Sequence, residues 1–130
     1  MKKGKVLNEH ISKAIASMGH GDMFVVADAG LAVPKGVDKI DVSVGKNIPG
    51  FLETVKVISE ELCVDKIIIP NQLKSNAKLY KEILKTFKNV EVESITADDW
   101  KDQLPDAKVV VRTGECTPYS VIILVCGVIF

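Results

Sequence analysis

The chain has 130 residues, of which 47% are hydrophobic and 26% are charged, and its 17 basic and 17 acidic residues give a formal net charge of zero. This composition is typical of a globular protein, so we expect one domain over residues 1–130 and no long disordered segment. The balanced charge and the lack of a basic stripe with interleaved aromatics argue against nucleic acid as a partner.

Neither terminal segment carries a recognisable targeting or membrane signal. Residues 1–8 are basic but have no apolar stretch behind them, and the apolar residues 119–130 are fewer than the roughly 20 that a membrane helix needs. We therefore expect a cytoplasmic protein that contacts no membrane. Cys63, Cys116 and Cys126 are odd in number and lack metal-ligand spacing. We expect buried free thiols, with Cys116 as the one candidate for reactivity, and no metal site.

The first half of the chain predicts two helices and two strands. Asn8 is a suitable cap for the first helix, because Ile11, Ile15 and Met18 follow at helical spacing. The elements predicted in this half are a helix over 9–18, strands at 23–27 and 40–44, and a helix from Pro49 to residue 62. Between the two strands, residues 28–36 have the glycine and proline content of a loop.

The second half alternates strands with helices in the same way. The predicted elements are strands at 66–70, 90–95, 109–111 and 121–124, a helix over 79–87, and a short helix that Thr96 caps and Pro105 ends. Strands that are apolar nearly throughout predict an α/β fold whose sheet is covered by helices on both faces. The apolar run 121–130 is longer than one small sheet needs to bury, so we expect oligomerisation.

His20 and Asp28 are the most informative polar residues, because they stand on either side of the apolar strand 23–27. Imidazole gives or takes protons near neutral pH, and a carboxylate can fix its tautomer, so the pair suggests proton-transfer chemistry. The glycines on both sides of His20 leave room for a ligand. Two structural alternatives stay open: His20 could only complete a helix end, and Asp28 could only form a turn.

Residues 112–119 form a second candidate for binding, a loop that combines charged, hydroxyl and aromatic side chains. An aromatic ring beside polar groups suits a neutral polyhydroxylated ligand, although the same loop could be a simple crossover. The segment around His20 precedes a strand and so does not match the dinucleotide fingerprint, and no phosphate-binding loop occurs. We therefore expect no cofactor.

Three motifs together resemble the RbsD/FucU family of sugar mutarotases over essentially the full length. They are Met1-Lys-Lys-Gly with Leu7-Asn8, Gly19-His20-x-Asp22 through Asp28-Ala29-Gly30 with Pro34, and Arg112-Thr113-Gly114-Glu115-x-Thr117-Pro118-Tyr119 with Gly127-Val128. The resemblance, which is stronger to the ribose branch, implies an RbsD/FucU-like mixed sheet and a cofactor-free isomerase. Such an enzyme interconverts the pyranose and furanose forms of D-ribose and supplies ribose for phosphorylation. The resemblance also implies homodecamers of two stacked pentamers, with sites at subunit interfaces.

By the same resemblance, His20 is the catalytic proton donor, Asp28 holds it or the sugar, and Lys101 and Tyr119 contact the sugar. Two positions depart from the family pattern. Ala97 stands where the family has a histidine, and Val121 stands where it has an asparagine. Unmet sugar hydroxyls cost roughly 1–3 kcal/mol each, so a different substrate, a weaker activity or a substitute contact from Asp98 would each follow from these changes.

Three other functions stay open at this point. The first is a mutarotase for another sugar such as fucose. The second is a non-catalytic sugar-binding or regulatory oligomer that keeps the fold but lacks two polar contacts. The third is a purely structural oligomer, which would bind no sugar.

Overall fold

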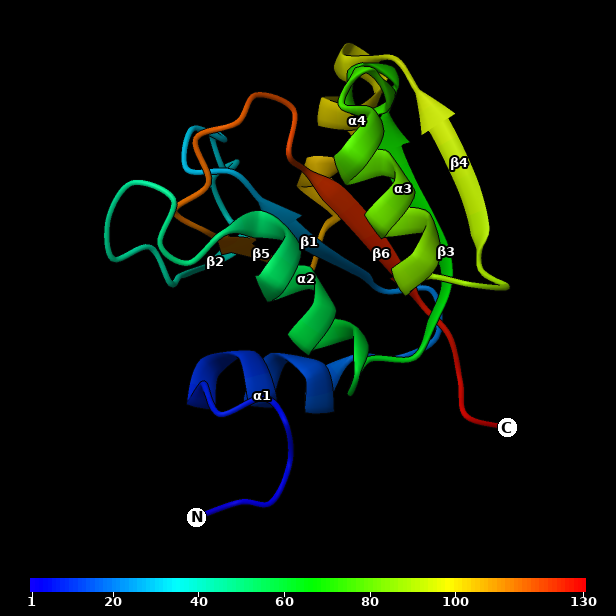
Figure 1. The fold of residues 1–130 in the computed structure, drawn as a ribbon. Helices are drawn as coiled ribbons and strands as arrows, with labels where there is room; N and C mark the ends of the chain where they lie inside the picture. Colours follow the sequence, from blue (N-terminus) through cyan, green and yellow to red (C-terminus); the bar gives the residue numbers. More distant parts are fainter.

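The protein is described here by a computed structural model of residues 1–130, and its centre is a six-stranded mixed sheet (Figure 1). The strands are β1 (Met23–Ala27), β2 (Asp38–Asp41), β3 (Val64–Pro70), β4 (Glu91–Ile95), β5 (Val109–Arg112) and β6 (Ile122–Cys126). Their order across the sheet is β2-β5-β1-β6-β3-β4. Only β6 is antiparallel to its neighbours, β1 and β3, and the other pairs are parallel.

Four α-helices and two short 3₁₀ helices connect the strands. The α-helices are α1 (Glu9–Ser17), α2 (Phe51–Ser59), α3 (Ala77–Thr86) and α4 (Ala97–Asp102), and the 3₁₀ helices are η1 (Asn71–Ser75) and η2 (Leu104–Asp106). Both predicted caps are confirmed. Asn8 Oδ1 accepts a hydrogen bond from the backbone N–H of Ile11 at 2.9 Å, and Thr96 Oγ1 accepts one from that of Asp99 at 3.1 Å.

Side chains of β1 alternate between two apolar cores, one on each face of the sheet. Phe24 and Val26 pack with residues of α1, α2 and α3, whereas Val25 and Ala27 pack with residues of α4 and η2. All four side chains are fully buried. The predicted α/β fold, with a mixed sheet covered on both faces, is therefore confirmed. No helix is long and apolar enough to cross a bilayer.

The region after β2 differs from the prediction. The strand ends at Asp41 rather than at residue 44, because its only neighbour, β5, ends at Arg112 and leaves nothing further to pair with. Val44 is consequently 84% exposed, in a loop closed by a bridge between Gly45 and Ile48. Helix α2 begins after Gly50 rather than at Pro49, and η1 is an element that the apolar pattern missed.

The five mutually parallel strands all end at the same edge of the sheet. β6 runs in the opposite direction, so it enters the sheet at this edge and leaves it at the other. In open α/β sheets, ligands bind beyond the carboxyl ends of the parallel strands. We therefore expect a binding site among the loops that follow β1, β3 and β4 and the loop that precedes β6.

Candidate active site

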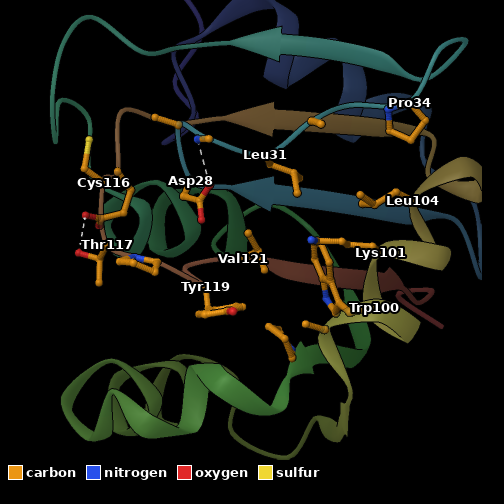
Figure 2. Close-up of a pocket in the computed structure, with 17 residues that line it drawn as sticks. Asp28, Leu31, Pro34, Trp100, Lys101, Leu104, Cys116, Thr117, Tyr119 and Val121 are labelled. Carbon is orange, nitrogen blue, oxygen red and sulfur yellow. Dashed lines mark hydrogen bonds between the residues drawn. The ribbon is translucent and has the colours of Figure 1, made fainter.

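A cavity of about 850 Å³ lies at the carboxyl ends of the parallel strands (Figure 2). It is lined by the loop after β1, the last residue of β3, helix α4, the first residue of η2 and the segment before β6. The residues are Asp28, Ala29, Gly30, Leu31, Ala32, Pro34, Pro70, Ala97, Trp100, Lys101, Leu104, Glu115, Cys116, Thr117, Pro118, Tyr119 and Val121. Its volume is in the range of small-molecule sites. Three of the four predicted site residues, Asp28, Lys101 and Tyr119, line it.

Asp28 is the half-buried carboxylate of this cavity. Its Oδ1 accepts a hydrogen bond from the backbone N–H of Gly30 at 3.0 Å, which is the Asx-turn expected at this position. Partial burial raises the pKa of Asp28, and nearby Glu115 raises it further, although backbone N–H groups of Gly30 and Leu31 oppose the shift. Asp28 thus combines a structural role in the turn with a carboxylate that binds protons more tightly than usual.

The raised pKa of Asp28 predicts a pH-dependent effect of the Asp28→Asn substitution on stability. A carboxyl whose pKa is higher in the folded than in the unfolded protein destabilises the fold above that folded pKa. We expect the variant to unfold at a higher urea concentration than the wild type at pH 7. This difference should disappear as the pH falls below the ordinary carboxyl range. A wild-type protein that is the more stable one at pH 7 would show that the ionised side chain is a net stabiliser.

A hydrogen-bonded loop before β6 fixes one side of the cavity. Thr113 is fully buried, and its Oγ1 donates to the carbonyl of Ala27 at 2.8 Å and accepts from the N–H of Glu115 at 3.2 Å. The Glu115 carboxylate accepts from the N–H of Phe51 at 3.2 Å and from Thr117 Oγ1 at 3.1 Å. The loop is therefore tied to both β1 and the start of α2, which keeps the residues that follow it in place.

Gly114 allows the closest backbone approach in this loop. A Cβ at this position would lie 2.5 Å from the carbonyl oxygen and 2.7 Å from the nitrogen of Ile48. We expect Gly114→Ala to lower the free energy of unfolding by about 1–3 kcal/mol, because backbone atoms cannot move aside as a flexible side chain can. Urea denaturation measures the effect. Gly45→Ala is the matched control, since its Cβ would meet open space, and equal midpoints for the two variants would refute the steric argument.

Lys101 and Tyr119 are exposed polar residues of the cavity. Figure 2 shows Lys101 extending from α4 toward Leu31 and Val121, and its ammonium group forms no ion pair in the molecule. Tyr119 is 45% exposed and has a φ of 60°, in the left-handed region of backbone conformation that residues other than glycine rarely adopt. Strain of this kind is often found at ligand sites, where it orients a side chain.

The opposite side of the cavity is apolar. Trp100 anchors it, since its indole is buried and donates from Nε1 to the carbonyl of Ile68 at 3.0 Å. Ala97 and Val121, the two positions that depart from the family pattern, both line the cavity. Asp98 is exposed and is not among the lining residues, so it does not replace the missing histidine in this conformation.

His20 does not lie at this cavity, which corrects the expectation of a couple with Asp28 within one chain. The two residues flank β1 at opposite ends, and its five residues span roughly 16 Å of extended chain. His20 Nε2 instead faces Asp65 Oδ2 at 3.3 Å, at the start of β3. Both side chains are more than half exposed, so this pair contributes little stability and leaves the imidazole accessible.

The other histidine and the cysteines differ in their exposure. His10 lies exposed on α1, away from the cavity. Of the expected buried thiols, only Cys126 is buried, and desolvation raises its pKa to about 11, so it is inert at neutral pH. Cys116 is exposed in the loop before β6 and lines the cavity, which corrects its interpretation as a small buried residue.

Many of the lining residues have no feature in the sequence that points to a site. Leu31 and Pro70 have no chemical signature, and only the parallel arrangement of β1 and β3 brings them together. Glu115 was noted in the loop at 112–119 but not as a contact of the cavity. The sequence gives no indication that its carboxylate accepts a hydrogen bond from the start of α2, because Phe51 and Glu115 are far apart along the chain.

Comparison with known proteins agrees with this arrangement. The profile of the RbsD / FucU transport protein family matches residues 1–129. The chain belongs to the RbsD/FucU family. A D-ribose pyranase of Coprothermobacter proteolyticus is 44% identical over 131 residues and is covered over its full length, as is this chain. The resemblance inferred from the sequence motifs is therefore confirmed.

Solved structures of relatives support the same conclusion. The structure of Bacillus subtilis RbsD complexed with D-ribose has a TM-score of 0.96 and 44% identity, with each chain covered completely. A fucose mutarotase from Streptococcus pneumoniae in complex with L-fucose has a TM-score of 0.82 at 23% identity, again with complete coverage. The second match shows that the fold extends across the sugar branches of the family, and the first places this chain beside the ribose branch.

Proposed function

We propose that this protein is a mutarotase that interconverts the pyranose and furanose forms of D-ribose. The observation that carries the proposal is a cavity in which Asp28, Lys101 and Tyr119 surround an apolar floor, in a chain 44% identical to a ribose-complexed relative. Polar groups can pair with sugar hydroxyls, while an aromatic ring and apolar side chains contact the C–H faces. We assign substrate binding to Asp28, Lys101 and Tyr119.

Ring opening and ring closure each need two proton transfers, and neither needs a redox step. The anomeric hydroxyl loses a proton, the bond between C1 and the ring oxygen breaks, and the ring oxygen gains a proton. The resulting aldehyde then closes on the other chain hydroxyl by the reverse transfers. A positioned acid or base contributes about 10²–10⁴-fold to such a step, which is enough for a reaction that already proceeds in water. In this proposal His20 delivers the proton to the ring oxygen.

His20 reaches the sugar only from a second copy of the chain, because its own cavity is at the other end of β1. A contact between two different surfaces of identical chains builds a ring when the rotation between copies closes. The decamer of two stacked pentamers that the family resemblance implies is consistent with this requirement, and we adopt it for the active assembly. We place the reaction in the cytoplasm, where a sugar kinase has ATP, and the free cysteines are compatible with that compartment.

Exchange spectroscopy on ribose tests the proposal directly. In NMR, magnetisation transfer between the pyranose and furanose signals should speed up in proportion to the protein concentration. Fucose and glucose measured under the same conditions report the sugar selectivity. Ribose exchange that stays at the buffer rate would overturn the proposed activity, and faster exchange of fucose than of ribose would reassign the substrate.

A non-catalytic sugar-binding oligomer is the second candidate, favoured by the apolar residues Ala97 and Val121 in the cavity. Calorimetry would support it by detecting ribose binding without accelerated exchange. Under the mutarotase proposal, Ala97→His should lower the KM for ribose by roughly tenfold, because one more hydroxyl gains a partner. Ala97→Leu, which adds volume without polarity, is the control. An equal KM for the wild type and Ala97→His would show that this position does not contact the sugar.

A further inference from the structure

Two large apolar side chains at the end of the chain are almost wholly uncovered. Ile129 is 94% exposed and Phe130 is 100% exposed. They follow β6, which carries the fully buried residues Ile122–Leu124 in the middle of the sheet. Apolar side chains of this size, next to each other and outside any core, are typical of a contact surface.

This segment leaves the sheet at the same end as His20. The N–H of Gly127 donates to the carbonyl of Cys63 at 2.9 Å, and Cys63 Sγ lies 3.3 Å from the carbonyl oxygen of Val128. Asp65, two residues beyond Cys63, is the residue that faces His20. Figure 1 shows the chain leaving β6 near the start of β3, with the C-terminus projecting away from the sheet on the side opposite the loops that line the cavity. His20 and the segment 128–130 therefore belong to one surface.

We propose that Ile129 and Phe130 of one copy dock at the rim of the cavity of the neighbouring copy and thereby position His20 over the bound sugar. The inference rests on the proposed function, because it assumes that His20 acts on the neighbour's cavity. The rim offers a matching surface, since Leu31 and Pro34 are partly exposed and the Tyr119 ring is 45% exposed. An aromatic side chain prefers such a partner to water.

One pair of opposite charges on the two surfaces also fits this contact. The surface around His20 presents the Asp65 carboxylate, which is 53% exposed, and the cavity presents, beside the carboxylates of Asp28 and Glu115, the Lys101 ammonium, which has no acidic partner in its own chain. Opposite charges facing each other fix the register of an interface more than its strength. Phe130 is thus a positioning residue, and His20 remains the group that touches the sugar.

The direct test is Phe130→Ser, measured by sedimentation and by ribose exchange. We expect a smaller assembly at micromolar concentration and exchange per chain at least about tenfold slower. Phe130→Leu, which keeps an apolar side chain, should retain both properties. Leu84→Ser is the matched control, because Leu84 is 37% exposed on the lysine-rich surface of α3 and should change neither readout. A wild-type assembly and rate in Phe130→Ser would overturn the proposal.

Co-expressed pairs of chains separate positioning from simple structural support. In the reference pair, one chain carries His20→Ala and the other carries Asp28→Asn. Adding Phe130→Ser to the Asp28→Asn chain removes Phe130 from the copies that supply His20. Adding it to the His20→Ala chain leaves those copies intact, with the same amount of altered chain in the assembly.

We expect exchange at the reference level when Phe130→Ser accompanies His20→Ala, and a rate at least about tenfold lower when it accompanies Asp28→Asn. Equal rates in the two arrangements would overturn the positioning role. A reference pair that is inactive although both chains assemble would instead show that His20 does not act on the neighbour's cavity. Wild-type protein that fails to accelerate ribose exchange would overturn the proposed function itself.

Discussion

Replacing His20 by alanine is expected to slow the catalysed exchange of ribose by about 10²–10⁴-fold, the contribution of one positioned acid or base. Binding of ribose should persist, because Asp28, Lys101 and Tyr119 line the cavity without help from His20. Stability should also persist. The His20 side chain is 67% exposed, and its one ionic contact is the exposed Asp65.

The measurement compares NMR exchange rates for the wild type and His20→Ala at equal concentrations of folded protein. His10→Ala is the matched control, since the second histidine of the chain is exposed on α1 and far from the cavity. Equal exchange rates for the wild type and His20→Ala would remove His20 from the mechanism. Loss of exchange together with loss of the assembly would assign it a structural role, so sedimentation accompanies the kinetics.

Combining two inactive variants in one assembly is expected to restore the exchange of ribose. His20→Ala keeps an intact cavity and Asp28→Asn keeps an intact imidazole, on different chains. If each site combines the cavity of one copy with His20 of its neighbour, random assembly of equal amounts yields wild-type surroundings in about one quarter of the sites. Each variant alone should stay near the buffer rate.

The two chains are best co-expressed with different tags, so that mixed assemblies can be purified and their composition checked by mass spectrometry. Exchange that remains at the level of the single variants, in assemblies proven to contain both chains, would contradict a shared site. A control pair of Asp28→Asn with Lys101→Ala should stay at the level of the single variants, because both substitutions alter the cavity and no site in the mixed assembly keeps wild-type surroundings.

The sequence was sufficient to predict features that depend on neighbouring residues. The caps at Asn8 and Thr96 have clear local chemistry, and the apolar strands 23–27 and 66–70 stand between polar boundaries. Asp28 was predicted from its place beside strand 23–27, and the family resemblance added Lys101 and Tyr119; the structure places all three around one cavity although they lie far apart in the chain. Their shared location depends on the loops at the carboxyl ends of the strands.

The sequence could not reveal which ends of the strands meet. A residue before β1 and a residue after β1 look equally close to an active site when only chain order is known, so chain order alone predicts His20 and Asp28 as one couple. The same limit applies to Pro70, which lines the cavity only because β3 is parallel to β1 with β6 between them. Strand order is a property of long-range pairing, and short motifs do not encode it.

The reversed direction of β6 links the two halves of the proposed site through a single rigid element. Tyr119 and Val121 precede this strand at the cavity, and the segment 128–130 follows it at the surface that carries His20. In the proposed assembly, the residues before β6 contact the sugar bound by their own chain. The segment after β6 positions His20 at the sugar of the neighbouring chain. Because β6 is hydrogen-bonded to β1 on one side and to β3 on the other, the distance between these two halves is fixed within each chain.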